Sequence, residues 1–210
     1  MPHTDLDRAI SSFDTALRGL TGAARSRRPN PAKATSSSEL DQETRKKSGR
    51  LMRINHCGEV CAQALYLGQG LTSRHESTRQ AMQKAAEEET DHLVWCTQRL
   101  KELDTRPSYL NPAFFAISFL GGAITGLLSN RINLGFVAAT EEQVVQHLDT
   151  HLEKLPEQDN GSKAILSQMR EDEAGHRTSA LNHGGLVFPT PIKKVMSLAS
   201  KVMTRSTYWI

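Results

Sequence analysis

The chain has 210 residues, of which 38% are hydrophobic and 23% charged, with a formal net charge of +3. This length suits one domain with a substantial core, and the composition excludes an intrinsically disordered chain. The three cysteines, Cys57, Cys61 and Cys96, form no CxxC pair, which argues against a disulfide framework and a structural zinc site.

The first 38 residues predict a short helix followed by a linker. Apolar residues recur at helical spacing within 1–20, which predicts an N-terminal amphipathic helix. Residues 21–38 are rich in Pro, Ser, Arg and small side chains, which predicts a linker. The early acids and the lack of a basic and apolar stretch disfavour a targeting segment. We expect residues 39–210 to form the main domain.

Four long helical patterns make up the centre of this domain, at about 40–71, 78–103, 133–155 and 163–182. Runs of Ala, Leu, Glu, Gln and Arg favour helix over strand in these stretches. Short breaks at 72–76 and at PEQDNGS (156–162) separate the members of each pair. The sequence therefore predicts two helical hairpins.

Two further segments carry apolar faces. Residues 113–128 are apolar apart from Ser118 and Thr125. They fall short of the roughly 18–20 residues that cross a bilayer, so we expect a buried or membrane-dipping crossover helix between the hairpins. Near the C-terminus, an apolar stripe runs beside lysines, and no Asp or Glu occurs from Arg177 onward. This predicts a basic amphipathic helix suited to an anionic membrane surface.

Two segments share the form acid-Glu-x-x-His, at EEETDH (87–92) and EDEAGH (171–176). On a helix this spacing places the glutamate and the histidine on one face, about one turn apart, so that the pair can reach a single ion. A single Glu-x-x-His match is common by chance, so the positions of the two matches within the hairpins carry the argument.

The glutamate of each Glu-x-x-His segment stands at the same height in its hairpin as a glutamate on the other helix. The first hairpin turns near residue 74, with Glu59 and Glu89 each 15 residues away; the second turns near residue 157, with Glu141 and Glu173 each 16 residues away. At a rise of about 1.5 Å per residue, each glutamate lies roughly 22–24 Å from its turn. Four glutamates and two histidines should therefore converge at one level of a four-helix bundle.

This arrangement is typical of di-iron carboxylate bundles. Carboxylate oxygens and imidazole nitrogens suit iron or manganese. We therefore predict an all-α, ferritin-like four-helix bundle, with a hydrophobic crossover helix and a C-terminal amphipathic helix, that holds two iron ions and activates O₂. The alternative is four glutamates solvated on surface helices. The predicted ligands are Glu59, Glu89, His92, Glu141, Glu173 and His176.

Geometry alone leaves two ligand choices open. Glu88 could pair with His92 at i, i+4, and Glu142 stands beside Glu141. Equal height in the hairpins favours Glu89 and Glu141. No catalytic residue beyond the metal ligands is predicted.

Four residues are candidates to support the ligands. Glu88 and Asp172 each precede a Glu-x-x-His glutamate, and we expect them to orient the histidines across the bundle. His56 lies three residues before Glu59 and could line the site, although a packing or capping role is an equal alternative. His147 is a candidate on the polar face of its helix.

The sequence resembles the demethoxyubiquinone hydroxylase family, the di-iron monooxygenases of ubiquinone biosynthesis. The resemblance covers roughly residues 45–210. It is carried by RINHCGEVCAQALYLGQ (53–69), EEETDHL (87–93), ATEEQVVQHL (139–148) and EDEAGH (171–176). It implies the same six ligands and selects Glu141 over Glu142.

The resemblance also implies an activity. A polyprenyl methoxy-methyl-benzoquinol (demethoxyubiquinol) would be hydroxylated on its ring, with O₂ as co-substrate and electrons from a donor that the sequence does not identify. Expected partners are this quinol, a membrane surface and other proteins of ubiquinone biosynthesis, with no nucleic acid. The expected location is peripheral, on the cytoplasmic face of a bacterial cell membrane.

Two other functions would use the same ligands. One is a ferritin-like iron oxidase, an iron-storage protein or a peroxide scavenger, which would not need the hydrophobic crossover. The other is a non-catalytic quinone-lipid carrier, against which the complete ligand set argues.

Overall fold

A computed structural model describes residues 5–35 and 39–210, and over these ranges the chain is helical and contains no strand. The parts of the predicted N-terminal helix and linker at 1–4 and 36–38 lie outside the described residues. The helices are α1 (Asp5–Thr21), the 3-10 helix η1 (Pro31–Ala34), α2 (Gln42–Thr72), α3 (Glu76–Glu102), α4 (Asn111–Leu127), α5 (Asn130–Lys154), α6 (Asn160–Asn182) and α7 (Thr190–Thr207).

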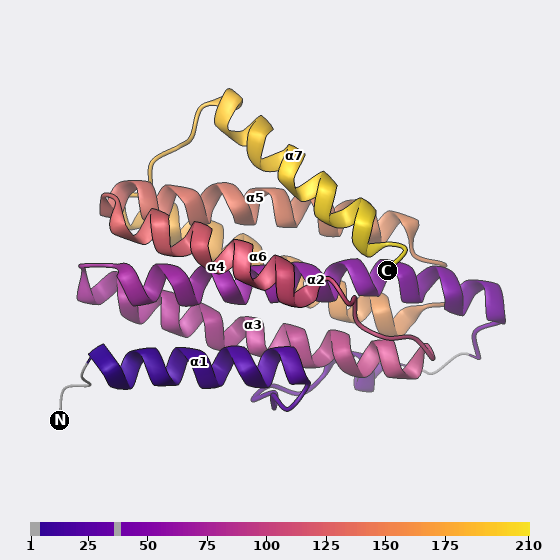
Figure 1. Ribbon diagram of the computed structural model, residues 1–210. Helices are drawn as coiled ribbons and strands as arrows, with labels where there is room; N and C mark the ends of the chain where they lie inside the picture. Colours follow the sequence, from indigo (N-terminus) through magenta and orange to yellow (C-terminus); the bar gives the residue numbers. More distant parts are fainter. Residues whose placement is uncertain (1–4, 36–38) are drawn as a thin grey trace.

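The bundle consists of two antiparallel hairpins, α2–α3 and α5–α6, joined by α4, which packs along the C-terminal half of α2 (Figure 1). Two buried apolar clusters fill it. One includes Trp95, Leu148 and Ile165, and the other includes Met82 and Val137. Along the helices, one cluster lies on each side of the level at which the predicted ligands stand. The predicted all-α, ferritin-like bundle is confirmed.

Side-chain caps fix where the central helices begin. Asp41, Ser129 and Asp159 each accept a hydrogen bond from a backbone N–H in the first turn of α2, α5 and α6, which satisfies a donor that has no partner within the helix. Asp159 also pairs with Arg99 of α3, with Nη2 2.7 Å from Oδ1. This buried pair ties the start of α6 to α3 and so helps to set the register between the hairpins.

The helix α4 packs on α2 through glycines. A Cβ atom added at Gly122 would lie 2.2 Å from the Leu65 carbonyl oxygen, and one added at Gly68 would lie 2.3 Å from that of Phe119. Only backbones without side chains can approach this closely. The expected crossover helix is present and is only partly buried: Phe115 and Phe119 pack against the cluster around Met82, whereas Ile117 is 66% and Ile124 is 60% exposed.

The helices α7 and α1 lie at opposite edges of the bundle (Figure 1). Both contact α2, and α7 is inclined to the bundle axis. Large apolar side chains on α7, among them Val195, Leu198 and Val202, are exposed. Within the described residues, no helix combines the length and apolar character that crossing a bilayer requires.

The glycine contact predicts opposite effects for two adjacent substitutions. Gly122→Ala should lower the free energy of unfolding by about 1–3 kcal/mol, because α2 and α4 must separate to admit the methyl group. At Gly121 the new Cβ would meet only Leu65 Cδ2, at 3.9 Å, so Gly121→Ala should be neutral or stabilise by up to about 1 kcal/mol. Urea denaturation measures both, and equal effects at the two positions would contradict the close packing of α4.

Candidate metal centre

All six predicted ligands meet at one level of the bundle. Glu59 comes from α2, Glu89 and His92 from α3, Glu141 from α5, and Glu173 and His176 from α6. The four glutamates and His92 are buried, and the His176 side chain is 13% exposed. Glu59, Glu89, His92 and Glu173 present ligand atoms that all lie within 4.8 Å of one another, and this group could hold a metal ion.

Three carboxylate oxygens surround one nitrogen of His92. Its Nδ1 atom lies 3.3 Å from Glu59 Oε2, 3.1 Å from Glu89 Oε2 and 3.3 Å from Glu173 Oε1. These atoms come from α2, α3 and α6, so three helices converge on one point.

The second histidine faces the other oxygens of two of the same carboxylates. His176 Nδ1 lies 3.0 Å from Glu173 Oε2 and 3.5 Å from Glu89 Oε1. Glu141 adjoins Glu173, and their two carboxyl groups interact. Glu89 and Glu173 therefore each direct one oxygen to His92 and the other to His176. These two carboxylates thus lie between the two histidines.

Each of the four glutamates has a buried oxygen that makes no hydrogen bond of good geometry, although three of these oxygens lie 3.3–3.5 Å from a histidine Nδ1. These atoms are Glu59 Oε2, Glu89 Oε1, Glu141 Oε2 and Glu173 Oε1. Buried carboxylate oxygens are normally satisfied by donors or by cations. Four unsatisfied oxygens together with two imidazole nitrogens make a donor set of the type that iron and manganese prefer. The residues therefore fit a metal centre.

The pKa shifts describe a cluster that attracts positive charge. Burial, together with neighbouring carboxylates, raises the pKa of Glu59 and Glu141 well above the usual range. Burial alone would lower the pKa of His176, but its contacts with Glu173, Glu89 and Glu88 raise it to about 10. Cations relieve the same repulsion between carboxylates that these shifts express.

Outer carboxylates hold both histidines from the opposite helix. His92 Nε2 on α3 lies 2.9 Å from Asp172 Oδ2 on α6, and His176 Nε2 on α6 hydrogen-bonds Glu88 Oε2 on α3. Because Nε2 is engaged, each ring points its Nδ1 atom toward the cluster. Outer partners of metal-binding histidines fix the orientation of the ring in the same way. The contacts expected of Glu88 and Asp172 are present, and their function stays a prediction.

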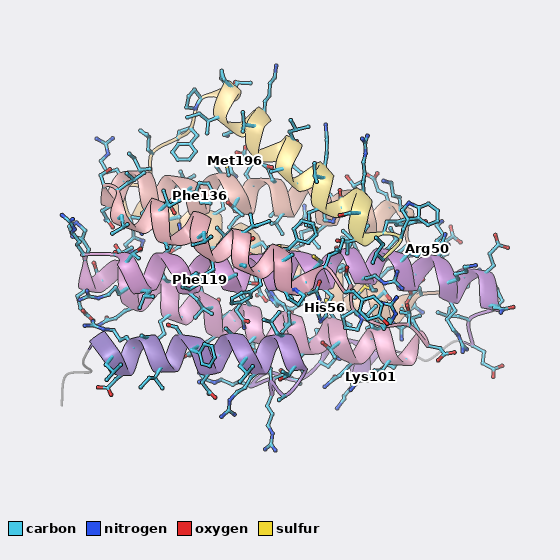
Figure 2. All side chains as sticks on the ribbon, viewed as in Figure 1. Arg50, His56, Lys101, Phe119, Phe136 and Met196 are labelled. Atoms are coloured by element: carbon cyan, nitrogen blue, oxygen red, sulfur yellow. The ribbon has the colours of Figure 1, made fainter. Side chains whose placement is uncertain are left out.

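The structure places the other two candidate histidines among different partners. His56 hydrogen-bonds Thr97 on α3 and Asn111 at the start of α4, and burial lowers its pKa to about 4. It thus connects α2 with α3 and α4, and Figure 2 labels it near the start of α4. His147 packs against His151, with ring centroids 3.9 Å apart. For both residues a contribution to the site stays a prediction.

Sequence reasoning missed two residues at the site. Tyr66 is buried and its hydroxyl donates to Glu141 Oε1 at 2.7 Å. It lies seven residues after Glu59, and this spacing of two helical turns on one face is the signal that could have revealed it. Arg28 lies within the predicted linker and contacts both Asp172 and His92. Nothing in the local sequence around Arg28 indicates that contact.

A small cavity between α2 and α5 reaches the cluster from the side of Glu141. It measures about 10 Å³, and its lining includes the polar residues Tyr66, Gln69, Thr140 and Glu141 besides the apolar Leu65, Phe136 and Val137.

The fold and the site together define a helical-bundle protein with a buried carboxylate–histidine cluster that could hold a metal ion. The family model described as ubiquinone biosynthesis protein COQ7 matches residues 46–207. The chain therefore belongs to the COQ7 family of ubiquinone biosynthesis proteins.

Similar curated proteins cover nearly the whole chain. The 3-demethoxyubiquinol 3-hydroxylase of Azotobacter vinelandii is 56% identical over 97% of this chain and 95% of its own length. The protein of that name from Chromohalobacter salexigens is 57% identical, over 96% and 95%. The one from Pseudomonas aeruginosa (strain PAO1) is 53% identical, over 99% and 97%.

Proposed function

We propose that this chain is a 3-demethoxyubiquinol 3-hydroxylase whose centre holds two iron ions. The observation that carries the proposal is the double use of Glu89 and Glu173, each of which directs its two oxygens to two different histidines. A single structural ion would not need this arrangement. Membership of a family whose curated relatives are named as hydroxylases of this quinol supports the activity.

The six ligands would be distributed over the two ions. Glu59 and His92 would hold one ion and Glu141 and His176 the other, with the two shared carboxylates between them. When bound, the iron pair would supply the redox chemistry by which O₂ and two electrons place one oxygen atom on the quinol ring and release the other as water. The hydroxyl of Tyr66 would fix the orientation of Glu141.

The quinol ring would reach the centre between α2 and α5. The cavity of about 10 Å³ between these helices is lined by Glu141 together with Leu65, Phe136 and Val137, so α2 and α5 would have to separate to admit a prenylated ring. The packed clusters on either side of the ligand level keep bulk water away from the reacting groups.

A single-turnover reaction tests this function. Protein loaded anaerobically with Fe²⁺ and exposed to ¹⁸O₂ with a short-chain demethoxyubiquinol should yield, by mass spectrometry, a product with one added ¹⁸O atom. Glu173→Ala should abolish the product, because both ion positions lose a ligand. Glu171→Ala, which removes an exposed carboxylate from the same helix, should leave the yield unchanged. Two bound irons without hydroxylated quinol would contradict the hydroxylase assignment and favour an iron oxidase.

We further propose that the exposed faces of α4 and α7 attach the protein reversibly to a membrane surface. The outward side chains Ile117, Leu120 and Ile124 of α4 are each at least 60% exposed. Lys194 and Lys201 on α7 are exposed and stand beside the apolar stripe of that helix. Apolar burial in the interface and attraction of lysines to anionic headgroups would act together.

Vesicle binding tests this attachment. Ile124→Glu should weaken co-sedimentation with vesicles of phosphatidylethanolamine and phosphatidylglycerol by roughly tenfold or more, because an isoleucine contributes about 1.5–3 kcal/mol on burial. Thr178→Glu, which adds the same charge at an exposed position of α6, should cause a much smaller loss. Equal losses for the two variants would show that net charge, and not the α4 face, governs binding.

A further inference from the structure

The segment 26–34, which we call the strap, lies against α3 beside His92. The backbone N–H of Arg27 donates to Asp91 Oδ1 at 2.6 Å, and Trp95 Nε1 donates to Ser26 Oγ at 3.1 Å. Further along, Asn30 Nδ2 donates to Gln98 Oε1 at 2.8 Å. These three anchors span about two turns of α3, so the strap is fixed in place over the helix that carries His92.

Arg28 extends from the strap into the gap between α3 and α6. Its Nε atom donates to Asp91 Oδ2 at 2.9 Å, and Nη1 lies 2.8 Å from Asp172 Oδ2. Its Nη2 atom lies 3.2 Å from His92 Nε2. The guanidinium carbon stands 4.8 Å from the centroid of the Trp95 ring. One planar side chain thus engages both helices that supply Glu-x-x-His ligands.

The planar guanidinium of Arg28 can orient Asp172, because Asp172 contacts both Arg28 and His92. The same oxygen, Asp172 Oδ2, contacts His92 Nε2 at 2.9 Å and Arg28 Nη1 at 2.8 Å. A guanidinium fixed by Asp91 and by the Trp95 face presents its N–H groups in one orientation. It therefore restricts where Asp172 can stand, and Asp172 in turn restricts the His92 ring.

The opposite histidine has a more exposed support. Glu88, the outer partner of His176, stands 3.7 Å from Lys84, which lies on the same helix and has a 79% exposed side chain. Exposed pairs of this kind contribute little. By contrast, Asp91 and Asp172 have side chains that are 5% and 16% exposed. The two halves of the centre repeat each other in their ligands but differ in what surrounds them.

We infer that Arg28 is a positioning residue, which fixes Asp172 and through it His92, so that the strap makes the ion position beside His92 the more tightly held of the two. This inference rests on the proposed two-ion centre and adds to it a difference between its halves. The segment that the sequence predicts as a linker thereby becomes part of the support of the metal centre.

The release of iron to a chelator tests the assignment without measuring activity. Protein loaded anaerobically with two Fe²⁺ ions should lose them to ferrozine in two phases, the slower one from the position beside His92. In Arg28→Met, which keeps an aliphatic chain over Trp95, the slow phase should accelerate by up to about tenfold, because Asp172, the outer partner of His92, is no longer held in one orientation. The fast phase should change little.

Two further variants separate positioning from general loosening. Arg27→Ala removes an exposed side chain but leaves the backbone bond to Asp91, and its release kinetics should equal those of the parent. Arg28→Lys keeps the charge beside Asp91 and protects folding, but it lacks the planar donors, so its slow phase should remain accelerated. Full restoration by Arg28→Lys, or equal acceleration of both phases in Arg28→Met, would overturn the inference. Failure of the parent chain to bind two ions would instead overturn the proposed centre itself.

Discussion

Four glutamate side chains share a space from which the surrounding helices exclude water, and the rest of the structure depends on this constraint. Buried carboxylates repel one another and lose their hydration, so they are stable together only where positive charge compensates them. Here the compensation is arranged in two layers. Two histidines and the proposed ions face the carboxylates, while Asp172 and Glu88 hold the histidines from outside.

The bundle is built to keep these groups at one level. Apolar clusters on both sides of the ligand level hold the four helices together, and the caps at Asp41, Ser129 and Asp159 fix where three of the helices begin. A shift of α6 by one residue along its axis would displace Glu173 by about 1.5 Å, enough to spoil its contacts with both histidines. The buried pair of Asp159 with Arg99 resists such a shift. The packing that makes the fold stable therefore also aligns the centre.

Much of this arrangement could be predicted from the sequence, because it follows from periodicity. Equal distances from two turns place Glu59 level with Glu89 and Glu141 level with Glu173, and a regular helix converts those distances directly into height. Contacts made by irregular segments have no such rule. Arg28 reaches Asp172 across 144 positions of sequence from a stretch whose composition indicates only a linker, so its place could not be foreseen. The close packing of α4 on α2 was also not foreseen, because it depends on where two backbones approach through Gly68 and Gly122.

Anomalous diffraction at the iron edge, from crystals of the iron-loaded protein, tests the central claim most directly. The account predicts two peaks in one chain, one beside His92 Nδ1 and the other beside His176 Nδ1, with the carboxylates of Glu89 and Glu173 between them. A single peak, or a second iron bound away from the six ligands, would contradict it.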